Sequence, residues 1–314
     1  MKQFGYLLLS IFSLALQGQQ IKMYFPHFAG KSYDFVIFQG DQQETIYQGV
    51  IPADGKFTLS VPDTYNNYKG MSRWLITGTS EGGGLDMFIP GHDFSVSCIE
   101  EQPNENNIIY TNNTGNKELN DLYKRQEGIL LRHGVMLEAT RIFSKADKNY
   151  PVFQKELQNQ VLAYNSFQKG LKKEPNYISQ FIQIVNITRG IGTKLFSVEK
   201  DKALNISDYI TNDLDWNALY TSGHWTSIID AWVNINTLVL KDPDFFAIGF
   251  KKIGNKIESP NMYSDFVGRT AYYLKQNKNE NINFIKIITP IVKSSGKILT
   301  YDGSLSTFNE AGSE

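Results

Sequence analysis

The residue types that most often carry metal or phosphate chemistry are present in this sequence, but their spacing is unfavourable. The histidines form no His-Glu-x-x-His sequence and no close pair that would bring two imidazoles to one metal ion; they are His27, His92, His133 and His224. The glycine run at 82–84 lacks the Lys-Ser/Thr that would complete a phosphate loop, and a hairpin loop is expected there. We therefore expect no catalytic residue, no cofactor-binding residue and no metal ligand.

A single cysteine, Cys98, sets the redox chemistry that the chain can perform. One cysteine excludes an internal disulfide, a Cys-x-x-Cys redox pair and a multi-thiolate metal site. Cys98 ends the strand-like run 94–98 and has no basic neighbour that would lower its thiol pKa. We expect a small core residue, with a reactive thiol as the less favoured alternative.

Carboxylates do not define a hydrolase either. Glu100 and Glu101 are adjacent, so on a strand they would face opposite sides, and Asp213 and Asp215 precede a helix, where acidic residues favour the positive end of the dipole. A hydrolase with residues dispersed over both parts of the chain stays open as an alternative.

Three tryptophans are the most distinctive cluster. Trp216, Trp225 and Trp232 lie within seventeen residues, and the last two, seven apart, share one helix face. Aromatic residues on a bundle face most often belong to the core. The alternative is a docking or ligand-stacking surface that would include His224, although a surface or capping role is more usual for that histidine.

The first part of the chain consists of short runs with the pattern of β-strands. Residues 20–112 alternate between apolar and polar, with turn signals at Gly40-Asp41, Asp54-Gly55 and Pro90-Gly91. Strands spaced about ten residues apart predict an antiparallel sandwich or barrel.

Helical periodicity replaces this pattern after the polar turn at 112–116. Residues 113–293 predict an all-helical bundle of six or seven segments, and Asp242-Pro243 and Ser259-Pro260 have the residue types of helix starts. Residues 294–314 are small and polar and are expected to form a linker-like tail. The predicted fold class is α+β.

The N-terminus has the composition of an export signal. Residues 1–18 combine Lys2, the apolar run 4–16 and the small residue Gly18, which together predict a cleaved signal peptide. No later run is apolar for long enough to cross a bilayer, so we expect an exported, soluble protein of the periplasm or cell envelope. With 31 Lys+Arg against 32 Asp+Glu and no basic stripe, nucleic acid is excluded as an expected partner.

Several short motifs carry a family resemblance. They are residues 50–57, Ile89-Pro90-Gly91, residues 113–116, the segment from Asp215 through Trp232, and residues 296–305. In this order they resemble the N-terminal region of TlpA-like envelope thioredoxin-family proteins, which place a small β-domain and a helical region before a thioredoxin domain.

The resemblance implies a docking role without catalysis. The redox site of that family is a Cys-x-x-C pair in the thioredoxin domain, which this sequence lacks. We expect a non-catalytic envelope module that acts as an accessory to a thiol–disulfide system, with an envelope protein or a missing thioredoxin domain as partner. The alternative is a stand-alone ligand-binding or scaffold protein that uses the interface between the β and helical parts.

Overall fold

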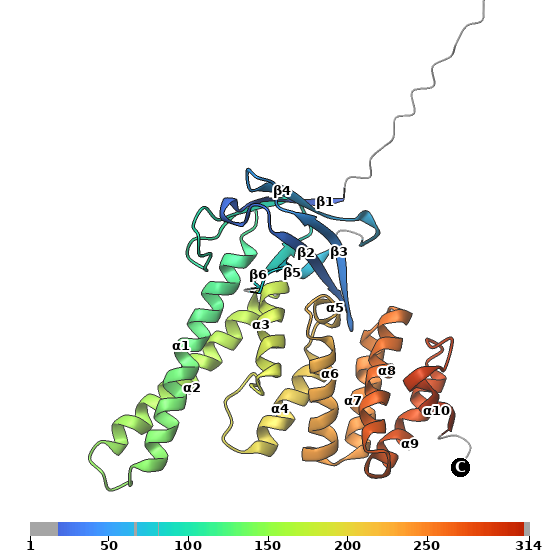
Figure 1. Cartoon of the computed structure of the whole chain (residues 1–314). Coiled ribbons are helices and arrows are strands. Elements are labelled where there is room, and N and C mark those ends of the chain that lie inside the picture. Colours follow the sequence, from blue (N-terminus) through green and yellow to red (C-terminus); the bar gives the residue numbers. More distant parts are fainter. Residues whose placement is uncertain (1–17, 66–67, 81, 311–314) are drawn as a thin grey trace, which may run out of the picture.

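A computed structural model describes residues 18–65, 68–80 and 82–310 of the chain (Figure 1). Within these ranges, eight strands precede ten α-helices, which confirms the predicted α+β class. The predicted signal peptide, residues 1–18, lies outside the described residues except for Gly18. No helix in these ranges combines the length and the apolar character needed to span a membrane.

The β part consists of two four-stranded sheets, in the orders β4-β1-β7-β8 and β3-β2-β5-β6. All pairs are antiparallel except β1 with β7, which are parallel. Apolar side chains fill the space between the sheets, around Phe35 and Trp74. The strands are β1 Gln19–Tyr24, β2 Ser32–Gln39, β3 Gln42–Val50, β4 Lys56–Val61, β5 Lys69–Thr77, β6 Gly84–Pro90, β7 Phe94–Ser97 and β8 Ile109–Thr111.

Cys98 follows β7 directly and is a free, buried thiol within this core. Its Sγ lies 3.4 Å from Oδ1 of Asn107, and only 2 % of the residue is exposed. The thiol is therefore enclosed by the sandwich and held away from solvent.

The helical part is more finely divided than the sequence predicted. The helices are α1 Gly115–Ile142, α2 Tyr150–Lys173, α3 Tyr177–Thr188, α4 Glu199–Asn212, α5 Trp216–Tyr220, α6 Trp225–Asn234, α7 Pro243–Lys256, α8 Pro260–Gln276, α9 Lys278–Ser294 and α10 Thr307–Glu310. A π-helical segment, Ile235–Leu240, extends α6. Both predicted N-caps hold, because the side chains of Asp242 and Ser259 accept from the backbone N–H groups of Phe245 and Met262.

Two details account for the larger number of helices. Gly223, with a φ of +77°, separates α5 from α6, so the segment from Asp215 through Trp232 forms two helices. The sequence prediction also missed α4, because polar residues outnumber the apolar positions Ala203, Ile206 and Ile210 that the helix buries.

Hydrogen bonds and a stacked aromatic pair join the β part to the helical part. The carbonyl of Thr221, just after α5, accepts from the N–H of Met71 at 2.9 Å and from the hydroxyl of Tyr177 at 3.0 Å. The Tyr177 ring stacks on Phe88 of β6, with centroids 5.0 Å apart. A Cβ on Gly70 would lie 2.5 Å from Cβ of Thr221, so β5 approaches this loop without a side chain between them. The β part consequently lies across one end of the helices (Figure 1).

The segment predicted to be a linker-like tail, 294–314, is instead folded against the helices as far as it is described. Phe308 of α10 is fully buried, and α10 contacts α9. The ammonium group of Lys297 donates to the carbonyls of Gly254 and Ile257 at 2.8 and 2.6 Å. Among the small polar residues of this segment are a few apolar ones, such as Ile298 and Phe308, which pack in the helical core.

Candidate functional site

The three tryptophans of the helical part lie in the core. Trp216, Trp225 and Trp232 are 4 %, 1 % and 1 % exposed. Trp216 and Trp225 meet edge to face at 5.6 Å, and Trp232 stacks on Phe246 at 4.7 Å. Their faces are therefore occupied by protein, so a ligand has no access to stack on them in this arrangement.

His224 does not share a surface with these tryptophans. The residue is half-buried, and its ring lies 5.7 Å from that of Phe181. Burial lowers the pKa of His224, and the positive charge of Arg73 lowers it further, whereas Asp86 opposes the change. Arg73 and Asp86 belong to β5 and β6, so His224 faces the junction between the two parts.

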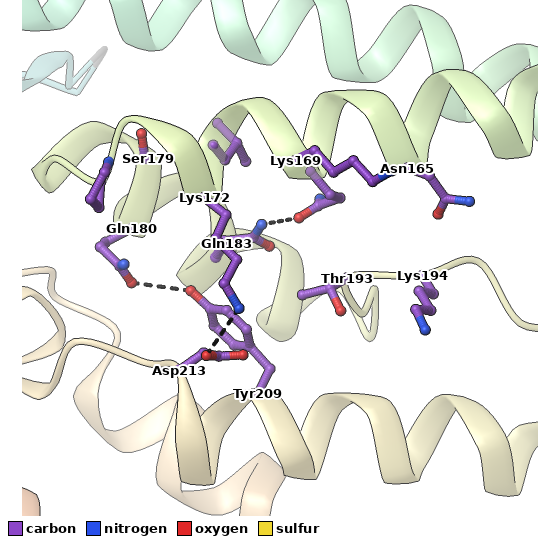
Figure 2. Close-up of a pocket in the computed structure, with 13 residues that line it drawn as sticks. Asn165, Lys169, Lys172, Ser179, Gln180, Gln183, Thr193, Lys194, Tyr209 and Asp213 are labelled. Atoms are coloured by element: carbon purple, nitrogen blue, oxygen red, sulfur yellow. Dashed lines mark hydrogen bonds and ion pairs between the residues drawn. The ribbon is translucent and has the colours of Figure 1, made fainter.

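A pocket of about 570 Å³ lies instead among α2, α3, α4 and the loop after α3 (Figure 2). Its volume is within the usual range for small-molecule sites. Most of the lining residues are polar in type, although their carbon atoms supply the larger part of the surface that faces the pocket. The lining comprises Asn165, Gln168, Lys169, Leu171, Lys172, Pro175, Ser179, Gln180, Gln183, Thr193, Lys194, Tyr209 and Asp213.

Lysines surround the opening of this pocket. Lys169 and Lys172 come from the last turns of α2, and Lys194 comes from the loop across the opening. Asp213 is the only acidic residue of the lining, and Lys172 donates to it at 3.4 Å. Neither Lys169 nor Lys194 has an ion pair through its ammonium group within the described residues.

Two glutamines of the lining use their oxygen atoms internally. Oε1 of Gln180 accepts from the hydroxyl of Tyr209 at 3.1 Å and from the N–H of Asp215 at 3.4 Å (Figure 2). Oε1 of Gln168 accepts from Nε2 of Gln183. Burial raises the pKa of Tyr209, and the negative charges of Asp213 and Asp215 raise it further. The hydroxyl therefore stays protonated and acts as a hydrogen-bond donor.

The loop that carries Thr193 and Lys194 is tied down on both sides. The hydroxyl of Tyr164, a fully buried residue of α2, donates to the carbonyl of Gly192 at 2.7 Å. Oδ1 of Asn205, on α4, accepts from the N–H of Lys194 at 3.1 Å. A Cβ on Gly192 would lie 2.2 Å from that same oxygen, so a larger residue here would displace the Asn205 side chain. The pocket wall is thus held in place without a ligand.

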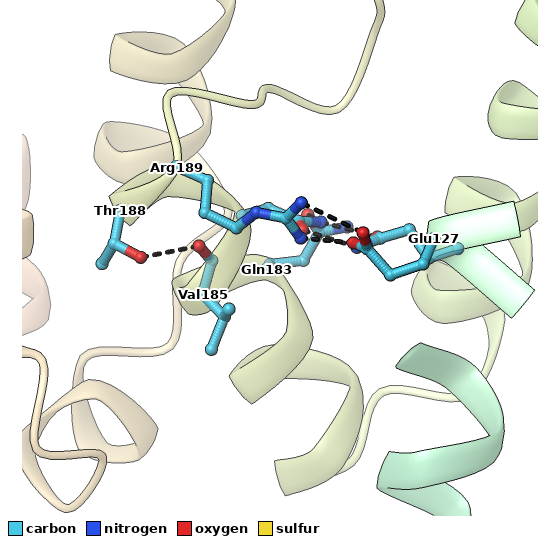
Figure 3. Close-up of polar contacts among 7 residues, drawn as sticks. Glu127, Gln183, Val185, Thr188 and Arg189 are labelled. Atoms are coloured by element: carbon cyan, nitrogen blue, oxygen red, sulfur yellow. Dashed lines mark hydrogen bonds and ion pairs between the residues drawn. The ribbon is translucent and has the colours of Figure 1, made fainter. Parts of the chain in front are cut away.

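Polar contacts between α1 and α3 support the pocket floor from behind. Arg189, at the end of α3, forms a two-pronged ion pair with Glu127 of α1, and the Thr188 hydroxyl donates to the Val185 carbonyl (Figure 3). Beside this pair, the buried amides of Gln126 and Asn186 donate to each other at 2.7 and 2.8 Å. Nδ2 of Asn186 also lies 3.5 Å from Oε1 of Gln183, which continues this chain of amides to the pocket.

Smaller hollows continue from the pocket towards the β part. One of about 330 Å³ shares Pro175 and Gln180 with the pocket and reaches Lys69 of β5. Another of about 290 Å³ shares Lys69 and Tyr177 with the first and reaches β6. The seam between the two parts is therefore hollowed on the side where the pocket opens.

In the pocket lining, no hydroxyl group is hydrogen-bonded to a carboxylate or an imidazole. Ser179 donates to the carbonyl of Glu174 at 2.9 Å, Thr193 donates to Oδ1 of Asn205 at 3.3 Å, and neither histidine nor cysteine lines the pocket. Among the described residues, no group of three or more His, Cys, Asp or Glu side chains could hold a metal ion. The arrangement can bind and orient a ligand through charge and hydrogen bonds.

One sequence pattern elsewhere resembles a hydrolase motif only in its letters. Residues 78–82 read Gly-Thr-Ser-Glu-Gly, but in the sequence they lie between β5 and β6, which pair as antiparallel strands. A nucleophile elbow requires a sharp turn from a strand into a helix, and Ser80 is an exposed residue followed by another strand. This serine therefore lacks the setting of a nucleophile.

Of the pocket residues, only Asp213 was considered from the sequence, as a residue that precedes a helix. The glutamines at 168, 180 and 183 form no motif, and their meeting depends on how α2 and α3 pack. Comparisons of the chain with models of protein families, with curated proteins and with solved structures find no match.

Proposed function

We propose that this chain is a non-catalytic ligand-binding module of the cell envelope and that its helical part holds a small polar ligand. The observation that carries the proposal is the preformed pocket of about 570 Å³ between α2, α3 and α4. The lysines and amides of its lining, together with the loop held by Tyr164 and Asn205, can orient a ligand through charge and hydrogen bonds. The envelope location rests on the signal-peptide composition of residues 1–18.

The alternative use of the interface between the two parts is compatible with this proposal. The hollow that reaches Lys69 joins the pocket to the seam, so an extended ligand would contact both parts. The ligand-binding alternative from the sequence is thereby moved from the tryptophan face to the surface beside α2 and α3.

A ligand screen with a pocket-blocking variant tests the proposal. Asn165 is half-buried in the pocket wall and has no hydrogen bond within the described residues, so Asn165→Trp would fill the opening with little loss of stability. We expect ligands found by ligand-observed NMR among envelope sugars, peptides and metabolites to lose binding to Asn165→Trp. They should still bind Asn159→Trp, a matched change at an exposed position of the same helix. If no compound of the set binds, or if every binder ignores Asn165→Trp, the proposal is wrong.

A second candidate function is the accessory role in a thiol–disulfide system that the family resemblance implies. The burial of Cys98 favours it over redox catalysis by this chain, because a thiol enclosed by the sandwich is poorly placed to attack a disulfide. Under this proposal the purified protein reduces insulin disulfides no faster than Cys98→Ser. A clear excess of activity over that variant would contradict it.

A further inference from the structure

We propose that the pocket between α2, α3 and α4 is specific for a small acceptor-rich dianion, a molecule whose carboxylate or phosphate oxygens carry two negative charges. The inference rests on the proposed binding function and names the ligand class of the same site. Three features of the lining carry it: the excess of lysines, the direction of the amide groups and the rigidity of the loop.

The lysines provide the charge. Three lysines face one carboxylate around the opening, and Lys172 pairs with that carboxylate, Asp213, at 3.4 Å. Asp213 and Asp215 also act on Lys256 at the end of α7, whose pKa is lowered by burial while the two carboxylates oppose the change. Lys172 and Lys256 thus balance the two carboxylates, and the charges of Lys169 and Lys194 are left for a ligand.

The amides provide the selectivity for acceptors. A glutamine side chain has an acceptor oxygen and an NH₂ group with two donor hydrogens. Tyr209 and Asp215 occupy the oxygen of Gln180, and Gln183 occupies that of Gln168. The group of Gln180 that is left over is its NH₂ donor, which has no hydrogen bond within the described residues, whereas Nε2 of Gln168 is shielded from solvent and interacts with the Tyr164 hydroxyl.

Donors alone favour an anion. A lysine ammonium group has three donors and no acceptor, so lysines and unused amide NH₂ groups together match carboxylate or phosphate oxygens. A ligand oxygen that accepts from Nε2 of Gln180 would use a donor that has no partner within the described residues. A cationic ligand would instead meet the uncompensated charges of Lys169 and Lys194.

The loop fixes the backbone position from which Lys194 extends towards the pocket. Tyr164 and Asn205 hold Gly192 and the backbone of Lys194 in place, which fixes the side of the pocket opposite α2. Binding therefore requires little ordering of the protein, and this lowers the entropic cost of association.

Isothermal titration calorimetry tests this inference on the purified protein with four probes. Digalacturonate supplies two carboxylates on a hydroxylated frame, glucose 6-phosphate supplies a phosphate ester, maltose is the neutral control and spermidine is the cationic control. We expect one or both anions to bind and maltose and spermidine to bind at least about tenfold more weakly, because a charge-assisted hydrogen bond contributes about 1.5–3 kcal/mol. Binding of only one anion identifies the carboxylate or the phosphate as the recognised group.

The lysines supply the second arm. Lys169→Gln together with Lys194→Gln should weaken anion binding by about tenfold or more, whereas Lys155→Gln, an exposed lysine earlier on α2, should leave it unchanged. Anion binding should also weaken as salt is raised from about 0.1 M to 1 M, since the screening length falls from about 10 Å to 3 Å. Equal affinity for maltose and the anions, or unchanged affinity in the double lysine variant, would overturn the inference.

The outcomes separate this inference from the proposed function. Tight binding of maltose or spermidine that is lost in Asn165→Trp would refute the dianion and keep a ligand-binding pocket. If neither anion binds, the inference fails, and the proposed function then stands or falls with the wider screen.

Discussion

The buried amide pair between α1 and α3 should be a strong determinant of the stability of the helical part. Gln126 and Asn186 are 1 % and 0 % exposed, and each donates to the other at 2.7 and 2.8 Å. Replacing Asn186 with leucine, which has a similar shape, removes both hydrogen bonds and leaves the donor and the acceptor of Gln126 buried without partners. Oε1 of Gln183 also loses its weaker contact, at 3.5 Å, with Nδ2 of Asn186. Each of the two Gln126 groups costs about 1–3 kcal/mol, so we expect the free energy of unfolding to fall by about 2–6 kcal/mol.

The double variant gives the sharper expectation. When Gln126→Met is combined with Asn186→Leu, no polar group of the pair is left unsatisfied, and replacing both partners by apolar groups of similar shape is nearly neutral. We therefore expect the double variant to be more stable than Asn186→Leu alone by about 2 kcal/mol, a coupling typical of residues in direct contact.

Urea unfolding followed by tryptophan fluorescence measures these differences. Three of the four tryptophans lie in the helical core, so the signal reports mainly on the part that contains the pair. The urea dependence of the unfolding free energy should stay constant while the midpoint moves. As a control, Asn159→Leu removes an exposed amide that bonds Glu156 and should change stability by less than about 0.5 kcal/mol. The reasoning fails if Asn186→Leu behaves like this control or if the two substitutions are additive.

Three further predictions concern the junction and the C-terminal segment. Burial and, to a smaller extent, the nearby Asp41 raise the pKa of Asp265 from 3.8 to about 6, although the hydrogen bond from the Tyr220 hydroxyl opposes the change. The folded state thus holds the proton more tightly than the unfolded state, so stability falls as pH rises from about 4 to 6; Asp265→Asn should remove this decline in pH-dependent melting and add about 1 kcal/mol above pH 6, after allowance for solvent screening. Gly70→Val places a side chain against Thr221 and should cost about 1–3 kcal/mol and make the β part and the helices melt separately in calorimetry, whereas a single unchanged transition would contradict the junction described. Phe308→Ala should lower the unfolding free energy by about 3–5 kcal/mol in urea, and a loose tail would show no change.

Local patterns in the sequence determined the class of the fold and most of its elements. Alternating apolar residues predicted strands up to about residue 112, and helical periodicity predicted helices afterwards, because each element must bury one face. The N-caps at Asp242 and Ser259 were visible for the same reason, since a cap depends on residues within one turn. The resemblance to the TlpA-like N-terminal region and the export signal stay predictions.

Long-range packing decided the details that local pattern does not encode. The tryptophan row has the same spacing whether it faces a ligand or other helices, and only the positions of Phe246 and its neighbours in the fold enclosed it. The C-terminal segment looked like a linker because its few apolar residues acquire a core only when α8 and α9 are beside them.

The pocket is the feature that depends most clearly on tertiary structure. Gln168, Gln180 and Lys194 lie on three different segments, and none has a sequence context that marks it as functional. The direction of each amide depends on which neighbour takes its oxygen, and those neighbours are Gln183 and Tyr209. Residue type and spacing determine which groups a helix can present, whereas the pairing of those groups across helices, and hence the donors left for a ligand, follows only from the packed structure.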